Sequence, residues 1–173
     1  MRAVVLYESM FGNTRDVAAA IAHGLSVDTG VDVEVVEVSR AQTTVASNVD
    51  LVVVGGPTHA LGMSRASTRM SAAEKAADEL VSPGDGLREW LAEAQLSPST
   101  AVAAFDTRVD KPRVPGSAAA AARRRLRRLG VRPVAPAESF FVEDMTGPLL
   151  AGELDRARRW GEQLAAEIAP APA

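Results

Sequence analysis

The residues best suited to chemistry in this sequence form the run Ser9-Met10-Phe11-Gly12-Asn13-Thr14 near its start. Its hydroxyl and amide side chains can donate hydrogen bonds, and its glycine lets the backbone turn tightly. If a helix begins at the end of the run, the N–H groups of its first turn and its dipole favour an anion at the same place. The run therefore predicts a site for a phosphate monoester. A plain helix cap, built from the same residue types, is the alternative interpretation.

Other kinds of site receive no support from the residue types. The run lacks the G-x-G-x-x-G motif of dinucleotide-binding folds and the G-K-[ST] motif of the phosphate-binding loop in nucleoside triphosphatases. The sequence has no cysteine and only two histidines, which gives no basis for a thiolate or metal site. Ser64, Ser67 and Ser71 have no neighbouring histidine and acid, so a hydrolase triad is not predicted and no catalytic residue is assigned.

The elements around the run are typical of an alternating α/β protein. Apolar, β-branched segments predict strands, of which the second carries acids as an edge strand does. Each polar stretch of interest follows one of these strands. The predicted strands are residues 3–7, 31–38, 50–56, 101–105 and 138–142.

Helices are predicted between these strands from the spacing of apolar residues. Regular alternation of strands and helices predicts a parallel sheet with helices on both faces, in a single domain over residues 1–173. Ligands of such sheets bind at the carboxyl ends of the strands, which directs attention to the loops after residues 8, 56 and 105. The helices are expected from Arg15, over much of 64–98 with an interruption at 82–86 and a restart at Leu87, and over 117–129 and 153–168.

Two of these loops resemble those of a known family. The segment VVLYESMFGNT resembles the first strand and phosphate loop of flavodoxins, and GGPTHALGMS (residues 55–64) resembles the loop of flavodoxins and flavin–quinone reductases that holds the isoalloxazine ring. The resemblance covers about residues 2–168. It implies FMN as cofactor and a three-layer, doubly wound, five-stranded parallel sheet in the order 2-1-3-4-5. Residues 66–86 are then an extra segment relative to short flavodoxins, and 169–173 a flexible tail.

The resemblance also implies which residues hold FMN. The first loop would bind the phosphate, the second would line the ring and the ribityl chain, and the third would face the pyrimidine edge of the flavin. The implied cofactor-binding residues are Ser9, Met10, Phe11, Gly12, Asn13, Thr14, Pro57, Thr58, His59, Ala60, Gly62, Asp106, Thr107 and Arg108.

The sequence departs from electron-transfer flavodoxins at the ring. Those proteins stack the ring between aromatic side chains, whereas residues 57–64 and 106–117 contain no Trp, Tyr or Phe. Each aromatic partner is worth about 0.5–1.5 kcal/mol beyond burial. Only His59 offers a π-face, with Met63, Val109 and Pro112 as apolar alternatives, and a histidine bonded to the backbone is the competing interpretation.

Three functions follow from this reading. The first is an electron carrier that docks with a redox partner protein, and the second is a small NAD(P)H-dependent oxidoreductase with a quinone-type acceptor. The third is a flavodoxin-fold binding or regulatory module without flavin. The lack of Trp, Tyr and Phe in the two ring loops favours the oxidoreductase over the electron carrier.

Charge and hydropathy limit the partners and the location. A net charge of −3 and the absence of aromatics among Arg123–Arg128 argue against nucleic acid, and this basic run is either a solvated face or a dock for an acidic partner. No segment approaches the roughly 20 apolar residues of a membrane span, and the start of the chain is too strand-like for a signal peptide. We expect a cytoplasmic protein. Its oligomeric state is not predicted.

Overall fold

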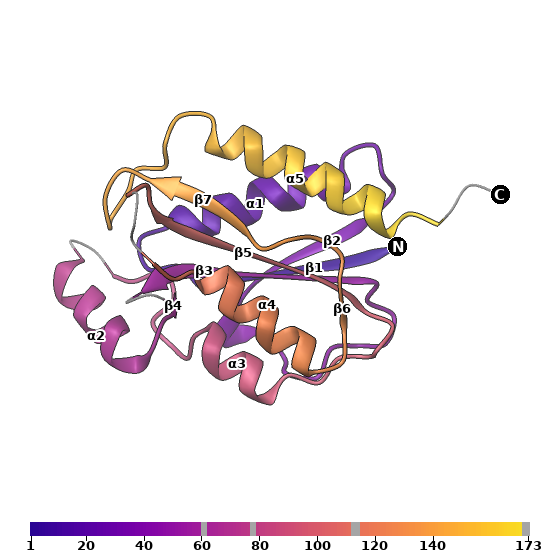
Figure 1. Ribbon diagram of the computed structural model, residues 1–173, viewed down its shortest axis with the longest axis horizontal. Helices are drawn as coiled ribbons and strands as arrows, with labels where there is room; N and C mark the ends of the chain where they lie inside the picture. Colours follow the sequence, from indigo (N-terminus) through magenta and orange to yellow (C-terminus); the bar gives the residue numbers. More distant parts are fainter. Residues whose placement is uncertain (60–61, 77–78, 112–114, 171–173) are drawn as a thin grey trace.

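The computed structural model describes residues 1–59, 62–76, 79–111 and 115–170. Its core is one sheet whose strands, apart from a two-residue antiparallel addition, run parallel (Figure 1). The strands are β1 (Arg2–Tyr7), β2 (Asp32–Glu37), β3 (Leu51–His59), β4 (Gly62–Met63), β5 (Ala101–Val109), β6 (Arg132–Pro133) and β7 (Glu138–Val142).

The predicted strand order is confirmed, with one refinement at the edge. The sheet runs β2-β1-β3-β5-β6, and β7 pairs with β5 further along the same side. The fifth position is therefore shared by two short strands. Pro133 and Pro136 explain the division, because a proline has no N–H to give to a ladder. β4, which pairs antiparallel with the end of β3, was not predicted.

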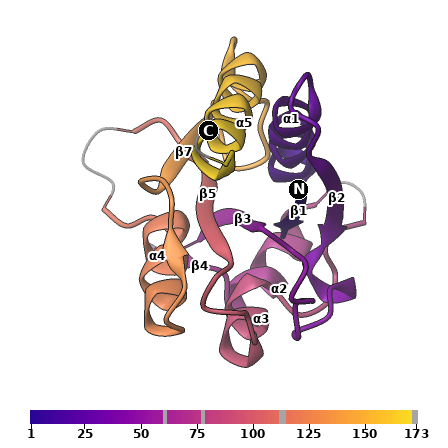
Figure 2. The same cartoon turned by 90° about the vertical axis from the view of Figure 1, so that its right-hand side faces the viewer.

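Helices cover both faces of the sheet. Figure 2 shows α1 and α5 on one face, with α3 and α4 on the other, while α2 lies near β4 at one end of the sheet in Figure 1. Besides the short 3-10 turn η1 (Val38–Arg40), the helices are α1 (Asn13–Ser26), α2 (Ala66–Lys75), α3 (Leu87–Glu93), α4 (Ala118–Arg128) and α5 (Glu153–Ile168).

The expectation of a largely helical stretch over 64–98 is wrong in extent. In the described part of this stretch only α2 and α3 are helical. Between them the chain turns back to the loop after β1, where the N–H of Val81 donates to the Met10 carbonyl (3.1 Å) and that of Ser82 to the Ser9 carbonyl (2.8 Å). These long-range bonds replace the helical ones.

Two apolar layers fill the space between the sheet and its helices. Alternate residues of each strand face opposite layers, so Val53 packs toward α1 and α5 while Val54 packs toward α3 and α4. The first layer holds an aromatic group, in which Phe105, Phe140 and Trp160 meet edge to face at 6.1–6.3 Å between ring centroids. A Cβ on Gly55 would lie 2.0 Å from the Phe105 ring, so the glycine on β3 makes room for it.

β3 and β5 are longer at their carboxyl ends than predicted. Residues 57–59 and 106–109 were expected to be loops, yet they continue the strands because each gains a partner: β4 for β3, and β7 for β5. The two extensions also pair with each other, with Pro57 opposite Thr107. The site described next therefore stands on strand ends rather than on free loops.

Candidate functional site

A cavity of about 250 Å³ opens at the carboxyl ends of β1, β3 and β5. Three sequence segments that were predicted to form a site meet at it. It is lined by most of the residues that the resemblance implied, namely Ser9, Met10, Phe11, Asn13, Thr14, Pro57, Thr58, His59, Thr107 and Arg108.

The loop between β1 and α1 has the geometry of an anion cradle. Gly12 precedes the first residue of α1 and has a φ of 98°, a left-handed conformation that favours glycine. Its N–H donates to Ser9 Oγ (3.1 Å), and the first bond inside the helix runs from the Asp16 N–H to the Gly12 carbonyl (3.0 Å). The N–H groups of the first turn before Asp16 therefore have no acceptor within the helix and can serve a ligand.

Side chains from other elements support this cradle. Thr14 Oγ1 lies 2.7 Å from Thr107 Oγ1, so a buried hydroxyl pair joins α1 to β5. Asn13 Nδ2 donates to the Thr146 carbonyl (3.1 Å) in the turn after β7. A Cβ on Gly147 would lie 2.7 Å from the Asn13 amide, which shows how closely this turn approaches. The cradle is thus held from two sides.

Asp106 does not line the cavity, although it was expected to face the ligand. Its carboxylate is buried at the N-terminus of α4, where Oδ2 accepts from the Thr58 hydroxyl (2.9 Å), the Ser117 hydroxyl (2.6 Å) and the Ala119 N–H (3.0 Å). Among the described residues, its Oδ1 has no partner. The Oδ2 atom of Asp106 is thus used to bind the start of α4.

The remaining predicted residues divide by position. Gly12 and Gly62 shape the backbone without being part of the lining, and Ala60 lies outside the described residues. Of the apolar alternatives to an aromatic stacker, Met63 is buried in the core with α3 and α4, Val109 lines the cavity, and Pro112 lies outside the described residues. Within the described lining, the aromatic rings are those of Phe11 and His59.

His59 ends β3 and is half-buried. Burial lowers the pKa of its imidazole below 6.5, and the nearby positive charge of Arg69 lowers that pKa further, against a hydrogen bond to the backbone of Thr68. The ring is therefore neutral near pH 7. His59 bonds the backbone of α2 and also lines the cavity, and its contact with a flavin stays a prediction.

One wall of the cavity was missed by sequence reasoning. Thr68, Ser71, Ala72 and Lys75 all come from α2, and the signal that could have found them is their spacing, which places them on one helical face. The extra segment 66–86 therefore contributes directly to the site. The lining also includes Val109, Val142 and Met145.

A buried polar network holds in place α2, the helix that carries this wall. The Ser64 hydroxyl donates to Glu8 Oε1, and the Leu87 N–H donates to Glu8 Oε2 (2.7 Å). Arg69 Nη1 donates to Ser64 Oγ (2.8 Å) and to Glu89 Oε2 (3.1 Å). The network joins the residue before the cradle to α2 and α3.

Glu8 should make stability depend on pH. Burial raises the pKa of its carboxyl above 4.5, although Ser64, Leu87 and Arg69 act to lower it. The folded protein then holds this proton more tightly than the unfolded chain, so the stabilising contribution is full below about pH 4.5 and is lost as the pH rises through the raised pKa. Glu8→Gln removes this titration.

We expect the free energy of unfolding of the wild type, relative to Glu8→Gln, to fall as the pH rises from about 4 to about 8. Urea unfolding at several pH values measures it. Glu34→Gln, which alters a half-exposed carboxyl on β2, serves as the control. A constant difference between wild type and Glu8→Gln across the range would contradict the role assigned to Glu8.

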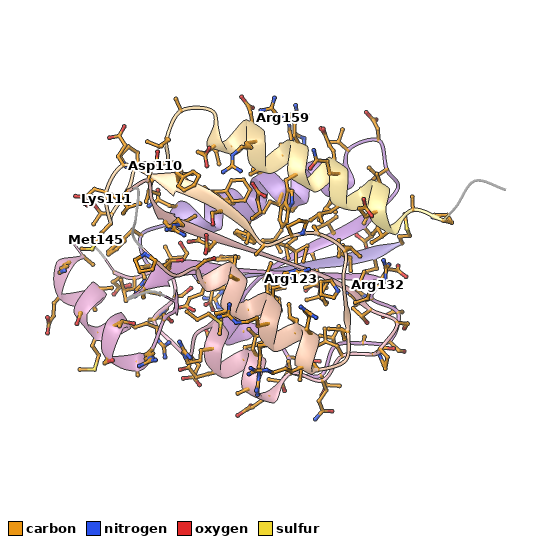
Figure 3. The ribbon with its side chains drawn as sticks, viewed as in Figure 1. Asp110, Lys111, Arg123, Arg132, Met145 and Arg159 are labelled. Carbon is orange, nitrogen blue, oxygen red and sulfur yellow. The ribbon has the colours of Figure 1, made fainter. Side chains whose placement is uncertain are left out.

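The basic face of α4 lies away from the cavity. Arg132 pairs with Ala101 at the start of β5, whereas the cavity is at the end of that strand. Figure 3 likewise shows Asp110, Lys111 and Met145 at one end of the molecule and Arg132 toward the other. Arg123 and Arg125 donate to the Ala135 and Leu91 carbonyls, so part of this face is structural.

None of the helices in the described part of the chain combines the length and the apolar character of a membrane span.

Comparisons with known proteins agree with the geometry. The family model described as Flavodoxin matches residues 5–136. An oxidised flavodoxin from Bacillus cereus is similar in structure, with 16% identity, a TM-score of 0.68 and 100% of each chain covered. A flavodoxin from the domain Archaea has 20% identity and a TM-score of 0.65, with 97% of this chain and 99% of that one covered.

A flavodiiron protein from Giardia intestinalis is also similar, at 17% identity and a TM-score of 0.62, with 96% of this chain and 36% of that one covered. No match was found among curated proteins. At these identities the structural likenesses show the fold alone.

Proposed function

The chain belongs to the flavodoxin family, and on that premise we propose that it is an FMN-binding redox protein whose cofactor occupies the cavity at the ends of β1, β3 and β5. The observation that carries the proposal is the chemistry of the lining. Hydroxyl, amide and N–H donors gather at the start of α1, and no described lining residue is acidic. A phosphate dianion needs donors and is repelled by carboxylates, so FMN suits this set of groups.

The residues of this chain would bind and orient the cofactor. Ser9, Asn13 and Thr14, with the first-turn N–H groups of α1, would hold the phosphate. The strand ends at Pro57–His59 and Thr107–Val109 would flank the ring. FMN, when bound, supplies reversible transfer of one or two electrons.

The finer role is either that of an electron carrier to a partner protein or that of a small NAD(P)H-dependent reductase. We favour the reductase, because in the described lining the second and third strand ends bring no Trp, Tyr or Phe to cover the ring. Anaerobic addition of NADH or NADPH to the FMN-loaded protein separates the two. Bleaching of the visible flavin band without any other protein is expected of the reductase. An unchanged band would favour the carrier.

Binding itself is tested by dialysis against FMN followed by a visible spectrum. Retention of about one FMN per chain is expected of the cradle, which suits a phosphate. A colourless protein that leaves FMN fluorescence unquenched would instead support the flavin-free binding module.

Thr14 offers a sharper test of the phosphate cradle. Thr14→Val keeps the shape of the side chain but removes its hydroxyl, and a lost hydrogen bond to a charged group should weaken FMN by about tenfold to a hundredfold. Riboflavin, which lacks the phosphate, should be affected by less than about threefold. Fluorescence quenching gives both affinities.

The matched control is Thr107→Val, which removes the other hydroxyl of the 2.7 Å pair. Because Thr107 would flank the ring, a direct contact of its own would weaken FMN and riboflavin alike. If Thr107→Val weakens FMN as much as Thr14→Val does and spares riboflavin, the loss reflects the broken pair rather than a direct contact of Thr14. Equal losses for FMN and riboflavin in Thr14→Val would contradict the assignment of the FMN phosphate to the cradle.

A further inference from the structure

α2 turns several polar side chains to the cavity. Thr68, Ser71 and Lys75 follow at helical spacing and line the cavity, while Met70 is 68% exposed on the outside. These polar side chains give the cavity a wall that suits a polar ligand.

The charge of the cavity lining is opposite in sign to that of the chain. The sequence has 22 acidic and 19 basic residues, yet the described lining contains Lys75 and Arg108 and no acid. Arg108 donates to the Gly116 carbonyl (2.9 Å). His59 adds no positive charge near neutral pH, because burial and Arg69 lower its pKa. Lys75 is the exposed cation on the α2 wall.

Lys75 is also the group on this wall that remains to meet an anion. The hydroxyl of Thr68 donates to the Arg65 carbonyl (3.0 Å), and that of Ser71 donates to the Ser67 carbonyl (3.2 Å), so both are used inside α2. Across the described residues, Lys75 has no ion pair. A cation without a carboxylate partner beside a cavity attracts negatively charged ligands.

The FMN phosphate is not the expected partner of Lys75. That group has its own donors in the cradle at the start of α1, whereas the wall begins at Thr68, against the His59 ring at the end of β3. Val109, Val142 and Met145, from β5, β7 and the turn after β7, add apolar side chains to the same lining. The cavity therefore offers both apolar surface and the ammonium of Lys75.

We propose that this space is a subsite for a second ligand, a planar apolar molecule that carries one anionic group, with Lys75 as the partner of that group. The proposal rests on the proposed function, since it takes the cradle as the place of the FMN phosphate. It names the chemical class of the co-substrate. A neutral molecule of the same shape binds less well because it offers no charge to the ammonium of Lys75.

The test uses the full-length protein loaded with FMN and two probes that differ in charge alone, anthraquinone-2-carboxylate and anthraquinone-2-carboxamide. Equilibrium dialysis gives the dissociation constant of each. The wild type is expected to bind the carboxylate about tenfold more tightly than the carboxamide. Lys75→Gln should abolish this preference and leave the carboxamide affinity unchanged.

Lys111→Gln is the matched control, because Lys111 is the other lysine of the chain and is not part of the cavity lining. It should keep the preference for the carboxylate. Equal binding of the two probes by the wild type would overturn the subsite. So would a Lys75→Gln variant that keeps the preference and loses affinity for FMN but not for riboflavin, because Lys75 would then serve the phosphate.

A separate measurement tests whether the proposed function itself fails. The flavin absorbance of the dialysed wild type is recorded before either probe is added. A wild type without FMN would overturn the proposed function and this inference together, whereas a wild type with FMN but no preference between the probes would overturn the inference alone.

Discussion

Replacing Gly161 by alanine is expected to lower the free energy of unfolding by about 3 kcal/mol. A Cβ at this position of α5 would lie 2.2 Å from the Ile21 carbonyl oxygen and 3.0 Å from the Leu25 nitrogen of α1. These are backbone atoms, so no side chain can rotate away and the two helices must separate. Gly24→Ala should have a similar effect, since its Cβ would lie 1.9 Å from the Arg158 carbonyl oxygen.

Denaturant unfolding of both variants measures the loss. Gly62→Ala is the control, because a Cβ there meets nothing within 4 Å. The double variant Gly24→Ala/Gly161→Ala should lose less than the sum of the single variants, because one separation of the helices relieves both contacts. Single variants that unfold at the wild-type midpoint would show that α1 and α5 do not depend on this close approach.

The second large effect is expected from Arg69→Met, at about 2–3 kcal/mol of unfolding free energy. The Arg69 side chain is only 10% exposed and donates to Ser64 and Glu89. Its removal takes away both hydrogen bonds and the positive charge near Glu8. Hydrogen bonds to a charged group contribute more to stability than an exposed surface pair.

Arg158→Met provides the comparison. Arg158 also pairs with a glutamate, Glu162, but both side chains are 41% exposed, and such pairs contribute about 0.3–0.5 kcal/mol. Hydrogen exchange should show faster exchange in α2 for Arg69→Met than for Arg158→Met, because Arg69 ties α2 to the core. If the two variants lose the same stability, the buried network does not anchor α2.

The strand order and the cradle could be predicted because their signals are local. Strands buried on both faces must be apolar, and the loop after the first of them carries Gly12 at the one place where the backbone becomes left-handed before α1. Asp106 shows where such reasoning ends. Successive side chains of a strand point to opposite faces, so Thr107 meets Thr14 while Asp106 turns toward α4. The sequence places both in one stretch and does not say which side each takes.

The wall formed by α2 was missed for a different reason. Its helical spacing is legible, but which face looks into the cavity depends on Arg69 reaching Ser64 and Glu89. Arg69 and Glu89 are 20 residues apart, and a contact over that separation leaves no local pattern. The extensions of β3 and β5 were missed likewise, because they depend on β4 and β7 as partners.

The divided fifth strand has a consequence for how the protein behaves in concentrated solution. An open sheet edge offers N–H and C=O groups on which another chain can add a strand and start aggregation. Between Arg132 and Ala137 two residues are prolines, which have no backbone N–H to donate to an incoming strand. At the other edge, β2 exposes the acids Asp32 and Glu34, which repel a second copy of the same strand. The β2 edge and the β6 part of the other edge are thus protected against edge-to-edge self-association.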